Sequence, residues 1–250
     1  MDAEKNNSRA ARMLNFVGIA CFIVAVVFII LLFLSGNDNV RIWYQNYLNY
    51  LMSAEYKVEH ANDKFSIFLI LIFLFAFKAV FPIYLYPVSA LCAVTSAVFP
   101  PYLSMPINYL GLAMLYSIKY YWGVKLGASG ARMILQKNAT IRYLIEKDGQ
   151  GNPWILVLLR VIPGVPINTV SQLYGSMRFP YLRYLLLSLA GYTPLLVFYT
   201  IIGHNVFNPL SVPFLLPLVL LFILLGVSAI ATGKIIQIQS KRRKINAGSQ

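Results

Sequence analysis

Long apolar runs are the feature that most limits what this chain can fold into. Four of them are long enough to cross a bilayer as helices of about 20 residues, and they occupy 14–34, 102–122, 182–203 and 213–234. Of the 250 residues, 59% are hydrophobic and 12% are charged. This composition is not that of a soluble domain, and it predicts an all-α polytopic membrane protein with about four spanning helices.

Prolines interrupt two further apolar regions, 65–99 and 153–177. Proline removes a backbone donor and clashes with the preceding helical turn, and broken backbone at membrane depth persists only where protein or water satisfies it. The arms 153–162 and 167–177 are too short to cross, so we predict a re-entrant hairpin there. The arms of 65–99 are longer, and a re-entrant hairpin and a tight pair of spanning helices both remain open.

The two interrupted regions share one order of features: a cation, a proline break, a Phe-Pro turn and then a spanning helix. The first has Lys78, Pro82, Pro87 and Phe99-Pro100, and the second has Arg160, Pro163, Gly164, Pro166 and Phe179-Pro180. Charge places the two units in opposite orientations, which predicts the inverted repeat of transport folds. Short matches of this kind also arise by chance in an apolar chain, so coincidence remains the alternative.

Basic residues flank the apolar segments, as the positive-inside rule requires. The formal net charge of +13 therefore does not indicate a nucleic-acid partner. Both termini and the 119–149 loop are predicted to be cytoplasmic, and the mixed-charge 35–64 loop faces outward. The predicted segments are a cytoplasmic tail (1–13), an anchor helix (14–34), an outer amphipathic loop (35–64), a membrane domain with both hairpins (65–203), a last span (204–234) and a basic cytoplasmic tail (235–250).

Lys78 and Arg160 have no acidic partner in any apolar segment, because all eight acidic residues lie in tails or loops. A buried cation without a partner is costly, so water, backbone carbonyls or an external anion must satisfy it. Arginine suits phosphate, and the helix N-termini after each break favour anions. We therefore predict a lipid headgroup site at Arg160, Lys78 and Asn168. Thr169, Ser171 and Gln172 follow as further hydrogen-bonding groups, or as groups that hold helix to helix.

An alternative for Lys78 is that its side chain snorkels to the membrane interface. Catalytic motifs are missing: the sequence has no GxSxG, HExxH, P-loop or Cys/His cluster. We predict that the protein is not an enzyme and that it has no cofactor and no metal site. Cys21 and Cys92 are predicted to be packing residues.

The segment Arg160-Val-Ile-Pro163-Gly164-Val-Pro166-Ile-Asn168, with Ala190-Gly191-Tyr192-Thr193-Pro194 downstream, resembles the C-terminal half of the VTT domain. This domain defines the DedA and SNARE-associated Golgi protein superfamily, and the Pro-x-x-Pro-x-Asn form is most similar to its TVP-like branch. The resemblance covers 155–203 and extends, more weakly, over 65–203. It implies two facing re-entrant hairpins and a role in moving lipids between leaflets, as scramblases or undecaprenyl-phosphate carriers do.

The chain departs from the DedA pattern at three places. Pro166 stands where a second arginine is usual, Lys78 and Tyr84 stand where acids are usual, and Ser89-Ala-Leu-Cys-Ala93 lacks the usual glycines. These departures favour passive lipid movement, or another substrate, over proton-coupled carriage of undecaprenyl phosphate.

The sequence therefore predicts a scramblase-like or flippase-like protein that moves phospholipid or another anionic lipid between leaflets. Its predicted partners are membrane lipids, either anionic phospholipid or prenyl phosphate, and a homo-oligomer is left open. The predicted location is a bacterial cell membrane with both termini cytoplasmic. Two alternatives remain: a small-solute or ion transporter with the same hairpins, and a membrane scaffold whose basic tail and amphipathic loops recruit partners.

Overall fold

The computed structural model describes residues 2–36, 38–59, 63–81, 86–137, 152–163 and 165–247. All regular structure in these ranges is helical, which confirms the all-α prediction. The helices are α1 (Asp2–Leu34), α2 (Asp38–Glu59), α3 (Lys64–Val80), α4 (Val88–Val98), α5 (Pro101–Lys137), α7 (Pro153–Val161), α8 (Ile167–Ser176), α9 (Tyr181–His204) and α10 (Val212–Ala247).

Three helical segments in the described chain are long and apolar enough to cross a membrane: Ala11–Leu34, Tyr181–His204 and Val212–Lys234. They match three of the four predicted spans and support an integral membrane protein. The fourth, 102–122, lies within α5, which is not among these segments, so the count of four is not confirmed. Polar side chains, among them Ser104, Asn108 and Lys119, make α5 less apolar, and the fold buries all three.

Helix α5 also continues past residue 119, where the sequence predicted a loop, and reaches Lys137 with a break at Gly127. Gly127 has a φ of 60°, in the left-handed region that favours glycine. The remainder of the predicted 119–149 loop, from residue 138 on, lies outside the described residues.

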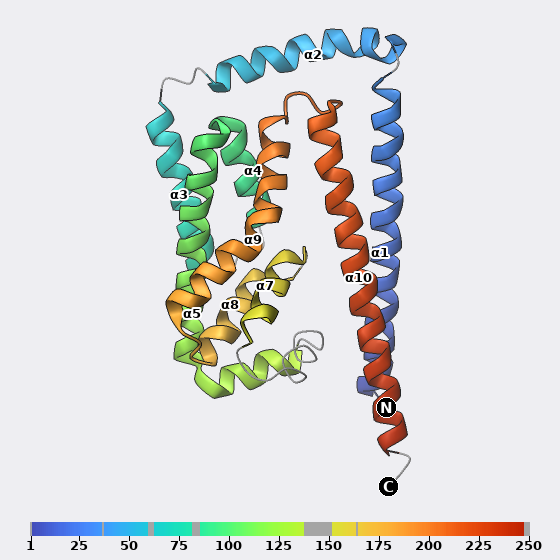
Figure 1. Cartoon of the computed structure of the whole chain (residues 1–250), viewed down its shortest axis with the longest axis vertical. Helices are drawn as coiled ribbons and strands as arrows, with labels where there is room; N and C mark the ends of the chain where they lie inside the picture. The colour runs from blue at the N-terminus through green and yellow to red at the C-terminus, as the bar shows by residue number, and fades with distance from the viewer. Residues whose placement is uncertain are drawn as a thin grey trace.

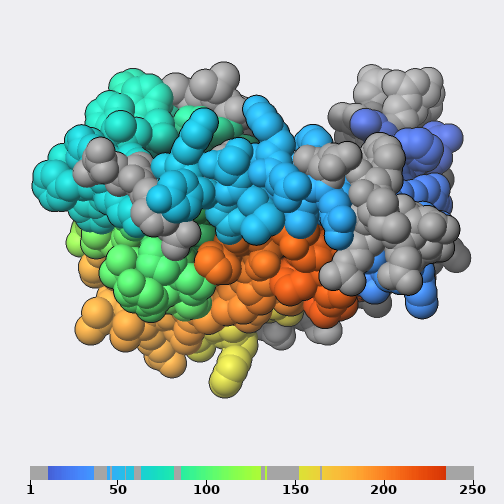
Figure 2. Space-filling view, turned by 90° about the horizontal axis from the view of Figure 1, so that it is seen from above, coloured from blue at the N-terminus to red at the C-terminus, as the bar shows by residue number. Residues whose placement is uncertain are grey.

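The helices form three groups: a body made of α3, α4, α5, α7, α8 and α9, a flanking pair made of α1 and α10, and a cap formed by α2. Helices α1 and α10 pack along each other as the pair, and α10 also contacts α9 of the body (Figure 1). Helix α2 lies across one end of the molecule, between α1 and α3. Figure 2, viewed from above, shows α2 crossing over the ends of α9 and α10. Much of the predicted outer loop 35–64 is thus helical, with Tyr44 buried and Tyr47 and Tyr50 exposed.

Each proline break ends one helix and starts another. Helix α7 begins after Asn152, whose side chain accepts the Trp154 N–H at 2.9 Å, and Pro153 occupies the first turn, where its missing N–H costs nothing. It ends at Val161, and the chain is extended at Ile162 before Pro163. Helices α7 and α8 have nine and ten residues, too short for a span of about 20. Pro82 and Gly164 lie outside the described residues.

The helices of the body pack in the same pattern in both halves. Helix α3 packs on α5 and α7 packs on α9, while the second arms cross over, so that α4 packs on α9 and α8 packs on α5. Figure 1 shows α4 in the upper half of the body and α7 and α8 in the lower half. The first unit consists of α3, α4 and α5, and the second of α7, α8 and α9. The two units interlock, because the short helix α4 of the first packs on α9 of the second, and α8 of the second packs on α5 of the first.

The two units also share identical residues at a constant spacing of 80 positions in the sequence, which we call the 80-residue register. The pairs at this spacing are Ser96 and Ser176, Phe99 and Phe179, Pro100 and Pro180, Gly111 and Gly191, and Gly123 and Gly203. A Cβ atom at Gly123 would collide with the backbone of Gln172 in α8, and one at Gly203 with the backbone of Ala93 in α4. Glycine is therefore required at the equivalent crossing in each half.

Candidate functional site

A cavity of about 340 Å³ lies where the turns of the two hairpins meet. This volume is at the low end of the range of about 300–1,000 Å³ for ligand pockets. Every described residue of the predicted site and hairpin breaks lines it: Lys78, Pro87, Arg160, Pro163, Pro166 and Asn168. Thr169 also lines the cavity, and α9 contributes Tyr192 and Tyr199. The fold thus joins two segments that lie about 80 residues apart.

Arg160 occupies the last turn of α7 and is only 2% exposed. Its Nη1 donates to the carbonyl oxygen of Ile167 at 3.2 Å, and its Nη2 donates to Ser171 Oγ at 2.8 Å and to Tyr184 Oη at 3.0 Å. The guanidinium also lies 4.2 Å from the ring centroid of Tyr116 in α5. Arg160 therefore ties both arms of its hairpin to α9 and α5.

These bonds leave part of the guanidinium unused. It has five N–H groups, and three of them make the bonds just given. Its Nε is buried and has no hydrogen-bond partner among the described residues. Because Arg160 lines the cavity, it offers an anion a full positive charge together with spare donors.

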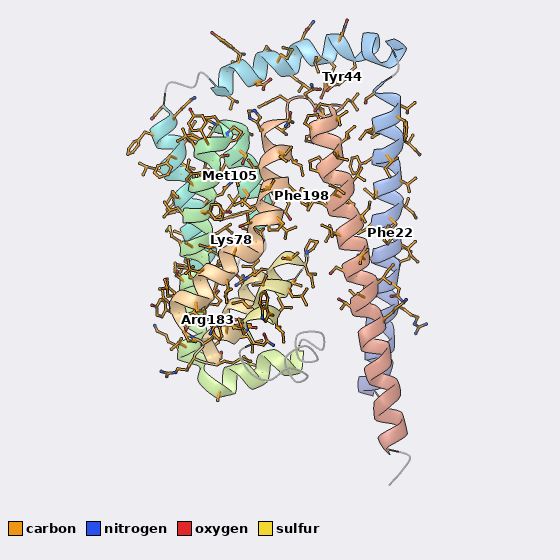
Figure 3. All side chains as sticks on the ribbon, in the orientation of Figure 1. Phe22, Tyr44, Lys78, Met105, Arg183 and Phe198 are labelled. Atoms are coloured by element: carbon orange, nitrogen blue, oxygen red, sulfur yellow. The ribbon has the colours of Figure 1, made fainter. Side chains whose placement is uncertain are left out.

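Lys78 occupies the equivalent place in the first hairpin, in the last turn of α3. It is 8% exposed, so its side chain is buried in the bundle, and Figure 3 shows it at mid-height. Its Nζ donates to the carbonyl oxygen of Tyr86 and lies 4.8 Å from the centroid of that ring. Tyr86 Oη in turn donates to the carbonyl oxygen of Leu74 at 2.9 Å. Lys78 thus ties the end of α3 to the segment that precedes α4.

The described lining of the cavity is cationic. No Asp or Glu occurs between residues 64 and 145 or between 149 and 250. Lys78 and Arg160 line the cavity, and none of its described lining residues is an Asp or Glu. Across the described ranges there is also no group of three or more His, Cys, Asp or Glu that could hold a metal ion.

The first turns of α4 and α8 add backbone donors to the cavity. Pro87 and Pro166 precede these helices, and neither proline side chain caps them. Val88, Ser89, Ile167 and Asn168 line the cavity just after the breaks. The first N–H groups of a helix have no partner within it, and its N-terminus carries partial positive charge. Both helices therefore direct positive ends to the region where the two cations lie.

Sequence reasoning found part of this site. Ser171 was expected to add a hydrogen bond, and it bonds Arg160, whereas Gln172 lies on α8 against α5. The sequence analysis did not identify Tyr116 and Tyr184, which contact the Arg160 guanidinium. A buried tyrosine in an apolar helix is a weak signal by itself, because 17 tyrosines are present in the chain.

The two tyrosines at Arg160 provide a matched pair of substitutions. Tyr184 Oη accepts from Arg160, whereas the buried Tyr116 hydroxyl has no partner in the described chain. We expect Tyr184→Phe to lower the free energy of unfolding by about 1.5–3 kcal/mol, the range for hydrogen bonds to charged groups. Tyr116→Phe should leave it unchanged or raise it, because the ring stays and an unpaired hydroxyl is removed. Thermal unfolding in detergent measures both, and equal losses would contradict this account.

The fold and the cavity define a class: an integral membrane protein whose helical body holds two broken-helix hairpins around a cationic cavity. The family model of the VTT domain matches residues 86–205, which supports the VTT/DedA superfamily for this chain, a family of membrane-associated, DedA-like proteins. The matched range runs from the segment before α4 to the end of α9 and includes Arg160 and Asn168. Searches of curated proteins and of solved structures found no match. Membership of the TVP-like branch stays a prediction.

Proposed function

We propose that this protein moves phospholipid or another anionic lipid between the leaflets of a membrane. One observation carries the proposal: the turns of both hairpins line a single cavity to which two buried cations, Lys78 and Arg160, contribute, and its described lining includes no Asp or Glu. A phosphate headgroup supplies the charge that such a cavity lacks. Arg160 contacts it through its spare donors, and Lys78 and Asn168 contact it from the two hairpins.

The proposed path separates the headgroup from the acyl chains. A polar headgroup cannot enter hydrocarbon cheaply, so the cavity and the free N–H groups of α4 and α8 replace its water. The acyl chains remain in the surrounding lipid. In this proposal the short arms α7 and α8 form a re-entrant hairpin from the cytoplasmic side, and α3 and α4 enter from the opposite side as the inverted counterpart.

The same observations favour passive movement. Proton-coupled carriers use intramembrane acids as proton relays, and the described helices α3, α4, α5, α7, α8 and α9 contain no Asp or Glu. We further propose that the protein is not an enzyme, that it needs no cofactor, and that it lies in a bacterial cell membrane with both termini cytoplasmic. We also propose that the chain belongs to the TVP-like branch.

The test is lipid movement in proteoliposomes. Fluorescent phospholipid is placed in both leaflets, and a membrane-impermeant reductant removes the signal from the outer leaflet. The proposed function predicts that vesicles with protein lose nearly all fluorescence, whereas protein-free vesicles lose about half. If folded, inserted protein moves no lipid but admits a soluble solute, the transporter alternative replaces the proposal. If it moves neither, the scaffold alternative does, and removal of 235–250 should then abolish its function.

A further inference from the structure

A third cation, Lys119, is buried in the body of the protein. It lies on α5, three residues after Tyr116, whose ring faces the Arg160 guanidinium. Lys119 is only 1% exposed and is among the largest fully buried side chains. The charge pattern had placed it in a cytoplasmic loop, but the helix continues through it and packs it inside.

The ammonium of Lys119 has little to compensate its burial. Its Nζ lies 4.3 Å from the ring centroid of Trp122. An ammonium is compact and strongly hydrated, and removing its water without providing acceptors is costly. One aromatic face supplies only part of what is lost.

The neighbouring charge increases this cost. Helix α5 packs on α3, which carries Lys78, and the like charges of Lys78 and Lys119 repel each other. Lys78 and Arg160 line the cavity, and Lys119 lies one turn beyond Tyr116, whose ring faces Arg160, so its charge adds to the positive potential there. In a poorly hydrated interior this field is weakly screened. An anion next to Lys78 would lower the energy of both lysines.

We infer that Lys119 makes the cavity select lipids whose headgroup carries a net negative charge over zwitterionic lipids. This inference rests on the proposed function, and it adds a residue that acts through its field rather than by contact. A zwitterionic headgroup brings an ammonium of its own into the same positive potential, so it gains less than an anionic one.

The test compares two lipids in the proteoliposome assay. Tail-labelled phosphatidylglycerol and phosphatidylethanolamine are measured in separate phosphatidylcholine vesicles, and the readout is the ratio of their rates. We expect the wild-type rate for phosphatidylglycerol to exceed that for phosphatidylethanolamine, so that the ratio of the two is above one. This ratio should persist in 0.5 M salt. At that concentration the screening length is on the order of 4 Å, and salt weakens interactions between exposed charges far more than those of a buried charge. Lys119→Met should lower the ratio about tenfold, equivalent to about 1.4 kcal/mol. Lys119→Arg should retain it.

Lys125→Met is the matched control, because Lys125 is an exposed lysine on the same helix. It should leave the ratio unchanged. If the wild type moves both lipids at equal rates, or if Lys119→Met moves lipid with the wild-type ratio, the inference is wrong and the proposed function stands. A wild-type preference that disappears in 0.5 M salt also overturns the inference, even if Lys119→Met does not fold. If the wild type moves neither lipid, both fail.

Discussion

Arg160→Ala is expected to abolish lipid movement and to destabilise the second hairpin. The substitution removes the three hydrogen bonds that join α7 to α8 and α9, together with the charge over Tyr116. A hydrogen bond to a charged group contributes about 1.5–3 kcal/mol of folding free energy, and we expect a loss of that order because removing an unpaired buried charge offsets part of the cost of the three lost bonds. The rate of lipid movement should fall on the order of 100-fold, since about 1.4 kcal/mol of barrier corresponds to tenfold.

Arg160→Lys separates charge from geometry. Lysine keeps the positive charge, but its single nitrogen cannot reproduce a planar fork that reaches three acceptors. We expect a folded protein that moves lipid about tenfold more slowly than the wild type, because less of the barrier reduction is lost than in Arg160→Ala.

Arg183→Ala is the control for both variants, because Arg183 is an exposed arginine on α9, near the end of the body away from α2 (Figure 3). Its effect on stability should stay within about 0.5 kcal/mol. Proteoliposome rates and thermal unfolding are measured on the same preparations. A folded Arg160→Ala protein that moves lipid at the wild-type rate would remove Arg160 from the path.

The broken second hairpin was predictable from the sequence because proline acts locally. The arms expected at 153–162 and 167–177 correspond to α7 (Pro153–Val161) and α8 (Ile167–Ser176) within one residue. Pro163 and Pro166 lie only three residues apart, and together they end one helix before the next begins, whereas the single prolines Pro106, Pro194 and Pro217 lie inside α5, α9 and α10. The extent of α5 was not predictable in the same way, because no proline stops that helix near residue 119 and burial allows it to continue.

Only the part of the site that lies in the short segment from Arg160 to Asn168 was predictable from the sequence. Arg160 and Asn168 lie in one short segment, and the lack of acids indicated an anion. Tyr184 lies 24 residues beyond Arg160, and Tyr116 lies on a helix of the other unit. The sequence analysis placed Lys119 in a cytoplasmic loop, because lysines at the ends of apolar segments usually lie on the cytoplasmic side and set the orientation of the helices. Only the packing of α5 on α3 and α8 shows that it is inside.

The 80-residue register leads to the last prediction, which concerns the crossings at Gly123 and Gly203. In each case a Cβ atom would meet the backbone of the opposite arm, at Gln172 or Ala93, and a backbone cannot yield as a flexible side chain can. Overpacking of a tight contact costs about 1–3 kcal/mol, occasionally more. We expect Gly123→Ala and Gly203→Ala each to lower Tm by about 5–10 °C.

Gly36→Ala is the control, because the closest atom to its added Cβ is the Phe33 carbonyl oxygen at 3.4 Å, an ordinary contact. Thermal unfolding in detergent should show little change for Gly36→Ala and similar losses for the two crossing variants. Similar losses matter because the two glycines occupy equivalent places only if the body consists of two interlocked units. A large loss at one glycine with none at the other would mean that the shared register is coincidental and that the halves pack by different rules.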